Sequence, residues 1–563
     1  MSEASPQSRR PRPGPLLSDS PTESSRSAGP GRRGRGQALP LLLRSPPEPW
    51  PLALAVALVA LLALAPLAAL ALLAIQGEAL PSLQLEAQGL TPLANTLMLV
   101  VGVGCAGGLI GTCNGWLTAR CQFPGRRWLR LAQLLPLATP SYLLAGTLID
   151  LGSRSGLRIA GPGWAMAILT LGTYSYVVLL SSEAFSRSGA RQQEVCRSLA
   201  VGPWGSFLRV ALPLALPAVT AGVALGAMEV INEFGAVQLL GVPTLSAAIL
   251  ERWQGEGDLP GAVGLALVTL ALVALLLWSE RQGRSRSRLW AAGQEGASPE
   301  LWPLQGWRCW LAQLVTLAPP LASLAIPLIW IASSWDQLPA QEAWDLVALG
   351  LRSLGLALGA TGLTIGAALV LSIGKRLVKG NLVRVLTDGA ALGYAIPGTV
   401  LALGFLVLGG GWGLAPLLLL VWGYVDRFLA VAKGGLDTAL EGLAPSVDEA
   451  AQSLGCDWIA LVGRIQLPLL RGPLLIAGVL VFVDTVKELP LTFALRPFDF
   501  DTLAVRVYQY ASDERLGAAL IPALVILVLG LVAAVALMPS LDQQIPDPPA
   551  LPRRPIPTAK PVP

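Results

Sequence analysis

Glu194-Val-Cys-Arg-Ser-Leu-Ala200 and Glu449-Ala-Ala-Gln-Ser-Leu-Gly455 are two related segments of this chain, 255 residues apart (449 − 194). The same offset takes Leu212-Pro213 to Leu467-Pro468 and Glu233 to Glu488. A register that extends well beyond one motif indicates an internal repeat, as membrane transporters often contain. The chain is therefore expected to consist of two homologous halves that carry the same polar segment.

The composition is that of an integral membrane protein in contact with lipid. Hydrophobic residues make up 53% of the 563 residues and charged residues only 13%, whereas a soluble domain is about a quarter charged. The formal net charge of +5 is small for this length, which argues against binding of nucleic acid.

The apolar runs predict an all-α integral membrane fold with twelve transmembrane helices, six in each homologous half. A run of roughly 18 to 20 apolar residues is long enough to cross a bilayer as a helix. The expected spans are 51–75, 95–117, 128–151, 164–180, 207–230, 261–278, 311–333, 351–373, 385–408, 413–431, 467–482 and 516–537.

Arginines and lysines cluster before the first expected span and after the second, sixth and eighth. The positive-inside rule then places both termini, and both repeated segments, on the cytoplasmic side of the membrane. We expect five regions: a disordered Pro-, Arg- and Ser-rich cytoplasmic arm (1–50), a first membrane half (51–280), a cytoplasmic linker (281–307), a second membrane half (308–539) and a Pro-rich tail (540–563).

Residues suited to enzymatic chemistry are scarce. The chain has no histidine, and its six cysteines form no CxxC pair, so neither a general base of the commonest kind nor a zinc site is expected. Gly374-Lys375 is followed by Arg376 instead of Ser or Thr, so the phosphate-binding loop pattern is not met. We predict a non-enzymatic chain without a cofactor, so that any ATP must be used by another subunit.

The second repeated segment has the features of a short cytoplasmic helix followed by a bend. Ser446 and Glu449 have capping-box spacing, and Gly455 is a helix terminator. An amphipathic connector that lies on the membrane surface would have the same sequence pattern. The presence of two copies in register favours a docking element for a partner instead. In the first copy Val195 and Cys196 replace the two alanines, and Gly202 comes late, so we expect the second copy to be the stronger contact.

The Glu-Ala-Ala, Gly and Leu-Pro pattern resembles the coupling motif of permease subunits of ABC importers, and the segment from Lys487-Glu488-Leu489-Pro490 onward resembles the ferric iron branch with two fused halves. The resemblance implies that two copies of a cytoplasmic ATPase and a periplasmic ferric-binding protein are partners. Thiamine and phosphonate importers, and less closely a secondary transporter, are the alternatives. The implied coupling residues are Glu194, Ser198, Leu199, Gly202, Leu212, Pro213, Ser446, Asp448, Glu449, Ala450, Ala451, Ser453, Leu454, Gly455, Leu467 and Pro468.

Paired acidic residues lie at the outer end of the fifth expected helix of each half, where Glu229 matches Asp484 and Glu233 matches Glu488. Ionisable groups inside a membrane usually face the protein interior or water, so these residues are candidates for the transport pathway. The alternative is that they lie beyond the membrane edge and form ion pairs at an outer gate. The candidate set is Glu229, Glu233, Asp484, Lys487, Glu488, Pro490 and Arg496, with no metal site assigned.

Overall fold

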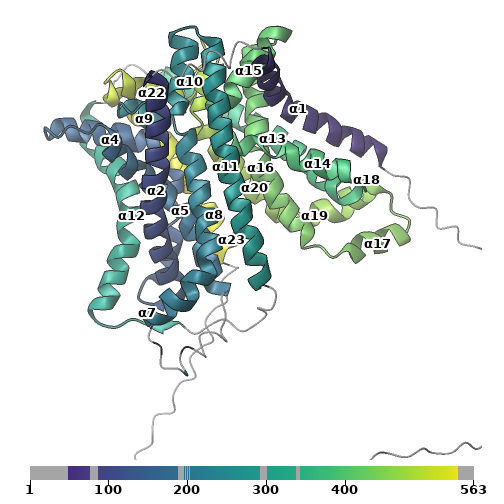
Figure 1. Cartoon of the computed structure of the whole chain (residues 1–563), viewed down its shortest axis with the longest axis horizontal. Coiled ribbons are helices and arrows are strands. Elements are labelled where there is room, and N and C mark those ends of the chain that lie inside the picture. Colours follow the sequence, from purple (N-terminus) through teal and green to yellow (C-terminus); the bar gives the residue numbers. More distant parts are fainter. Residues whose placement is uncertain are drawn as a thin grey trace, which may run out of the picture. The chain divides into compact units, whose positions relative to one another are not determined.

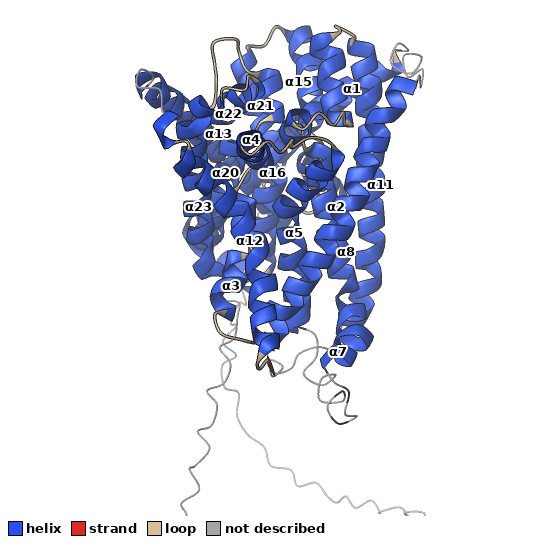
Figure 2. Ribbon diagram, turned by 90° about the vertical axis from the view of Figure 1, so that its left-hand side faces the viewer, coloured by secondary structure: helices blue, strands red, loops and turns tan. Residues whose placement is uncertain are grey.

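The computed structural model describes residues 49–76, 87–187, 196, 198, 201, 203–291, 301–337 and 343–542. Helices dominate these residues (Figure 2), because a helix satisfies its own backbone polar groups, as lipid requires. One parallel pair of two-residue strands, β1 (Cys121–Gln122) and β2 (Trp302–Pro303), is also present. The predicted all-α class is confirmed. The expected arm before residue 49 and the tail after 542 lie outside the described residues.

The first half runs from α1 to α11. Its elements are α1 (Trp50–Ile75), α2 (Ala87–Arg120), α3 (Arg126–Ala132), η2 (Leu135–Ala138), α4 (Ser141–Arg154), α5 (Pro162–Arg187), α7 (Pro203–Ser206), η3 (Phe207–Ala211), α8 (Leu212–Asn232), α9 (Gly235–Leu239), α10 (Leu245–Leu250), η4 (Glu251–Gly255) and α11 (Leu259–Ala291). Helix α11 continues into the region expected to be the linker.

The second half runs from α12 to α23. Its elements are α12 (Trp307–Ser333), η5 (Trp335–Gln337), α13 (Ala343–Leu377), α14 (Asn381–Ala390), η6 (Gly393–Ala395), α15 (Gly398–Trp412), α16 (Pro416–Glu441), α17 (Pro445–Ser453), α18 (Trp458–Leu461), η7 (Val462–Gln466), α19 (Leu467–Leu469), α20 (Arg471–Lys487), α21 (Pro490–Leu495), α22 (Leu503–Ser512), η8 (Leu516–Ala519) and α23 (Leu520–Asp542).

The described chain contains eight straight helices that are long and apolar enough to cross a membrane, or eleven if three bent pairs are counted as spans. The predicted number of twelve is therefore not confirmed. The helix left over is α16, in which Asp426, Arg427 and Lys433 interrupt the apolar run.

Two of the predicted spans are broken in the middle by proline. The chain turns by 86° between η2 and α4 and by 115° between η6 and α15. Thr139 and Ile396, which precede Pro140 and Pro397, have extended backbones, because the proline ring disfavours a helical residue before it. Both breaks leave non-helical backbone inside the bundle, which membrane proteins tolerate where it lines a cavity.

The two halves exchange their first helices. Helix α1 packs on α13, α14 and α15 of the second half, and α12 packs on α3, α4 and η2 of the first half. Figure 1 shows α1 beside α14 and α15, and α12 beside α4. The main hydrophobic core likewise contains residues of both halves, among them Phe234, whose ring lies 5.6 Å from Phe493 and 5.4 Å from Tyr508.

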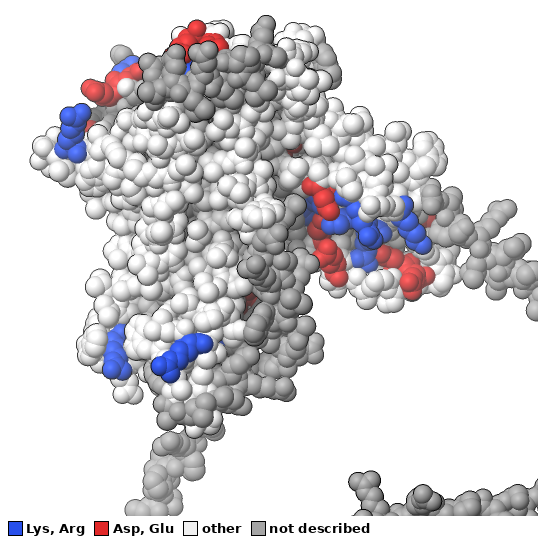
Figure 3. Space-filling model, viewed as in Figure 1, with Lys and Arg blue, Asp and Glu red and all other residues white. Residues whose placement is uncertain are grey.

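The repeat is visible in the packing as well as in the sequence. Helices α2, α5 and α8 pack on one another in the first half, as α13, α16 and α20 do in the second. The face in Figure 3 is uncharged over most of its middle, and a mixed group of acidic and basic residues lies in the region of α14 and α18. Apolar side chains such as Leu54 and Leu58 of α1 are exposed, as expected of a surface that faces lipid.

Candidate functional site

Matching carboxylates stand at the ends of α8 and α20. Glu233 Oε1 accepts a hydrogen bond of 2.8 Å from the N–H of Ala236 in α9, and Glu488 Oε1 accepts one of 3.0 Å from the N–H of Leu491 in α21. Ala236 and Leu491 are themselves 255 residues apart. Each carboxylate thus satisfies a free N–H group in the first turn of the short helix that follows it.

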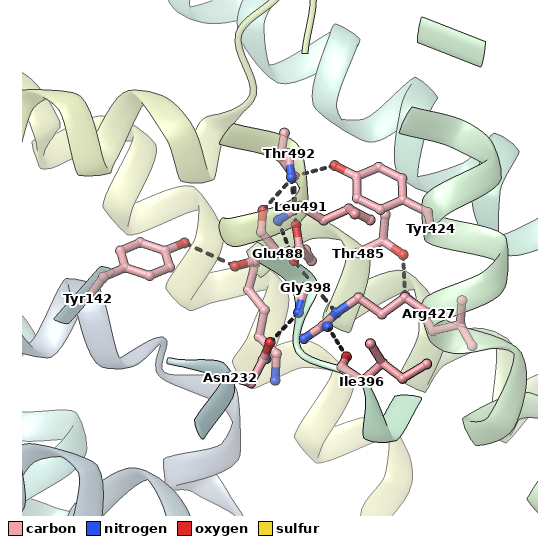
Figure 4. Close-up of polar contacts among 12 residues, drawn as sticks. Tyr142, Asn232, Ile396, Gly398, Tyr424, Arg427, Thr485, Glu488, Leu491 and Thr492 are labelled. Carbon is pink, nitrogen blue, oxygen red and sulfur yellow. Dashed lines mark hydrogen bonds and ion pairs between the residues drawn. The ribbon is translucent and has the colours of Figure 1, made fainter. Parts of the chain in front are cut away.

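Glu488 is the more deeply held of the two. Its Oε2 accepts hydrogen bonds from the N–H of Thr492 (3.0 Å) and from Thr492 Oγ1 (2.9 Å). Its Oε1 lies 3.6 Å from Nε of Arg427, and the two residues are only 5% and 6% exposed. Figure 4 shows this group with Gly398, whose N–H donates to Asn232 of the other half. A buried charge is tolerated only when it is paired, and here the pair comes from α16 and α20.

The other acids follow an asymmetric pattern. Lys487 Nζ lies 2.8 Å from Asp484 and donates to the Leu137 carbonyl at 3.2 Å. Glu233 accepts a hydrogen bond of 2.7 Å from Ser141 Oγ, with no ion pair within the described residues. Glu229 likewise makes no ion pair to any described residue, although Lys487 lies near enough to influence its charge. Cations therefore pair with the acids of the second half and not with those of the first.

These groups line a cavity of about 90 Å³ between the two halves, enough for a few water molecules. Its polar lining comprises Thr139, Ser141, Tyr142, Thr173, Tyr176, Glu229, Asn232, Glu233, Tyr394, Arg427, Asp484, Lys487 and Glu488. Pro490 also lines it, whereas Arg496 does not, because its guanidinium pairs with Asp501 and lies over the Phe493 ring. Of the seven residues proposed from sequence, six meet here.

Sequence reasoning missed the polar residues of the cavity that come from outside the fifth spans: Thr139, Ser141, Tyr142, Thr173, Tyr176, Tyr394 and Arg427. Tyr176 of the first half and Tyr394 of the second half both line the cavity. Arg427 could have been predicted from the sequence, since a charged residue inside an apolar run is a functional candidate by default. The tyrosines gave no such signal: Tyr142 and Tyr394 are brought inward by the broken helices, and Tyr176 by the packing of α5.

The cavity offers oxygen donors and two cations. Carboxylate and phenol oxygens suit hard metal ions. Yet within the part of the chain that the structure describes, no three Asp, Glu or Cys side chains are grouped so that they could hold a metal ion. The carboxylates would first have to leave their present hydrogen bonds. In this conformation the cavity therefore offers polar groups but no assembled metal site among the described residues.

The second repeated segment forms a helix, a bend and a second helix. Helix α17 ends at Ser453, and Gly455 follows with φ +83°, the left-handed conformation that commonly ends a helix. Asp457 then caps α18 by accepting from the N–H of Ala460 at 2.9 Å. Glu449, Ala450, Ser453 and Gly455 are exposed, and Leu454 is 85% exposed. A partner could therefore contact this face directly.

The predicted capping box at Ser446 is wrong. Pro445 occupies the first position of α17 and Ala444 precedes it, so Ser446 already lies within the helix and caps nothing. Asp448 does not face outward either, because its carboxylate binds Arg376 and Gln466. Ala451 is buried. Some of the coupling residues implied by the resemblance are therefore not part of the exposed surface of this segment.

The first copy is only partly described. Glu194, Leu199 and Gly202 lie outside the described residues, and Ser198 is exposed. Beyond them the two copies match closely: α7, the π-helical turn η3 and the Leu212-Pro213 start of α8 correspond to α18, the π-helical turn η7 and Leu467-Pro468 at an offset of 255. Such π-helical turns are rare and are frequent at functional sites.

Comparison with known proteins agrees with this geometry. The family model described as "Binding-protein-dependent transport system inner membrane component" matches residues 107–282. The sulfate transport system permease protein CysT of Escherichia coli is 30% identical over 208 residues, which cover 34% of this chain and 75% of CysT. The chain belongs to the binding-protein-dependent permeases.

Two further relatives extend the match. The Fe(3+)-transport system permease protein FbpB 2 of Haemophilus influenzae is 26% identical to this permease over 442 residues, which cover 76% of the chain and 85% of FbpB 2. The molybdenum transport system permease protein ModB of Escherichia coli is 29% identical over 203 residues, covering 31% of the chain and 87% of ModB. The FbpB 2 match is the one of the three that extends over both halves.

The permease is thus a multi-pass inner-membrane subunit of an ABC importer. Permeases of this family work with a separate ATPase and a substrate-binding protein. This chain has two candidate functional regions: the pair of repeated segments and the cavity between the halves.

Proposed function

We propose that this permease moves ferric iron inward across the cytoplasmic membrane through the cavity between its two halves. A periplasmic ferric-binding protein delivers the ion, and two copies of a cytoplasmic ATPase drive the cycle. Both termini lie in the cytoplasm, on the side of the repeated segments.

The choice of cargo rests on one observation: the two acids of the first half have no cationic partner among the described residues. Asp484 and Glu488 have cationic partners, whereas Glu229 and Glu233 have none among the described residues. The cavity therefore has an excess of formal negative charge beside three tyrosines. That lining attracts a hard cation, and like-charge juxtaposition disfavours an anion. FbpB 2, which matches both halves, is named as an Fe(3+) permease.

An oxyanion is the second candidate cargo, because CysT and ModB are named for sulfate and molybdenum transport. Lys487 and Arg427 are the cavity groups that would favour it. Both already have carboxylate partners, so an anion would have to displace Asp484 or Glu488.

The drive mechanism rests on the matched segments α7 to η3 and α18 to η7. ATP-driven closure of the two ATPases would move these segments together, and the attached α8 and α20 would shift the acids that they carry at their other ends. Such a cycle requires that the ATPases bind the two conformations with different affinity.

Uptake of radiolabelled ferric iron, sulfate, molybdate and thiamine in cells with and without the gene tests the cargo. Loss of ferric uptake alone supports the proposal, and loss of sulfate or molybdate uptake alone would transfer the same architecture to an anion. Docking of the ATPase is tested separately. Glu449→Arg in the full-length permease should abolish co-purification of the ATPase. Glu441→Arg, an exposed acid at the end of α16, is the matched control and should retain it.

A further inference from the structure

Arg376, near the end of α13, binds three separate groups at once. Its Nε lies 2.6 Å from Asp448 Oδ2 in α17, its Nη2 donates to the Leu443 carbonyl at 3.1 Å, and its Nη1 donates to the Leu440 carbonyl. The side chains of Arg376 and Asp448 are each 14% exposed. The guanidinium thus sits at the junction between a bundle helix and the segment that follows it.

The charges at this junction fit the ends of the two helices. Leu440 is in the last turn of α16 and Leu443 just follows it, where carbonyls lack helical partners and a cation is favoured. Asp448 is in the first turn of α17, where a carboxylate is favoured. The planar fork of arginine can serve all three acceptors, which the single ammonium of lysine cannot reproduce.

Little else within the described residues holds α17 to the bundle. Ala451 is its one buried residue. The other polar tie leads from the same carboxylate, since Gln466 Nε2 donates to Asp448 Oδ1 at 3.2 Å, and Gln466 is the last residue of η7. Asp448 therefore joins α13, α17 and η7 through two hydrogen-bonded side chains.

The positions that match Arg376 and Gln466 in the first half hold other residue types. At the repeat offset Arg376 corresponds to Cys121 and Gln466 corresponds to Ala211, and both of those residues are buried. Neither can form a charged fork or a side-chain amide bond. The duplication therefore does not by itself account for Arg376 and Gln466 at these two positions.

We propose that Arg376 is the positioning residue that transmits movement of α17 to the membrane bundle, through α13 and the end of α16. The inference rests on the proposed function of α17 as a docking element for an ATPase. Helix α13 packs on α1, α16 and α20, so a displacement received at Arg376 reaches both the exchanged helix α1 and the helix that carries Glu488.

The test compares Arg376→Gln with Arg376→Lys in the full-length permease. Arg384→Gln, an exposed arginine on α14, is the matched control. Three quantities are measured: the ATPase that co-purifies, ATP hydrolysis by the purified complex, and uptake of whichever tracer the wild type takes up. R376Q should retain the ATPase but transport at least about fivefold less per ATP hydrolysed, the lower range of allosteric coupling. R376K should fall between, and R384Q should match the wild type.

A merely structural role would lower the amount of complex, so that hydrolysis and uptake fall together and their ratio stays constant; that result overturns the proposal. Should R376Q fail to accumulate in the membrane, Asp448→Asn tests the same link and leaves the contacts of Arg376 to Leu440 and Leu443 in place. If the wild type itself retains no ATPase, the proposed function fails. If the wild type retains it and R376Q and D448N transport normally, only the role of Arg376 fails.

Discussion

Replacing Glu488 by alanine should destabilise the permease far more than replacing Glu233, its partner in the repeat. Glu488→Ala leaves Arg427 buried without its carboxylate, which costs about 3–5 kcal/mol, and removes the cap of α21, which costs about 1 kcal/mol. Glu233→Ala removes the cap of α9 and the bond from Ser141, together about 2 kcal/mol. The expected difference is therefore about 2–4 kcal/mol.

The assay is the fraction of purified permease that stays monodisperse after heating, since large membrane proteins often unfold irreversibly. E488A should lose half of this fraction at a clearly lower temperature than E233A. In the double variant E488A/R427M the orphaned cation is gone, so part of the stability should return. Equal damage from E488A and E233A, or no recovery in the double variant, would show that the ion pair with Arg427 does not account for the difference.

Three other substitutions have defined outcomes. Gly455→Val should reduce ATPase co-purification several-fold, whereas Gly455→Asn should retain it, because asparagine tolerates the left-handed φ of +83° and a β-branched residue does not; equal binding by both would refute the role of this bend. Gly393→Ala places a methyl group 2.3 Å from the Asp426 carbonyl oxygen and should lower thermal stability and uptake, while Gly410→Ala, which meets open space, should change neither. Asp426→Asn should raise thermal stability, because both carboxyl oxygens are buried without a partner in the described chain, and an acid held there must either carry an unpaired charge or be protonated at a cost that a neutral amide does not have; a loss of stability would refute this account.

Apolar run length and the 255-residue offset were enough to predict an all-α membrane fold with two related halves. They could not predict how far the chain turns at Pro140 and Pro397, because a count of apolar residues gives the length of a span but not its direction. Helix α16 shows a second limit of sequence-based prediction, which concerns its charged residues. Its Arg427 is buried against Glu488, a partner from another part of the chain that is known only once the helices are packed, whereas Lys433 pairs with Asp437 within α16.

The candidate site was predictable to the extent that the offset paired Glu229 with Asp484 and Glu233 with Glu488. The sequence alone could not distinguish two alternatives for these residues. They could line a transport pathway, or they could lie beyond the membrane edge and form ion pairs at an outer gate. The structure places all four around one cavity. At Ser446 a local capping pattern was misleading, because proline is favoured at the first helical position and the helix begins at Pro445, two positions before the start that a cap at Ser446 implies.

The repeat explains the acids of the cavity but not its cations, and this difference gives the two halves separate roles. Lys487 corresponds to Asn232 at the repeat offset, so the cation beside Asp484 is an amide in the first half, where Asn232 accepts the Gly398 N–H instead. Glu229 and Glu233 consequently keep their formal charge free of any described ion pair, while Asp484 and Glu488 do not. A cationic cargo entering between the halves would therefore meet the first-half acids without breaking an ion pair, and would need to break one to reach the second. Exchanging the two residues, as Asn232→Lys with Lys487→Asn, should transfer the lysine from Asp484 to the first-half acids and retain transport, whereas Asn232→Lys alone should lower the excess negative charge of the cavity and reduce uptake of a cation. Uptake by the single variant equal to that of the wild type would contradict this division of roles.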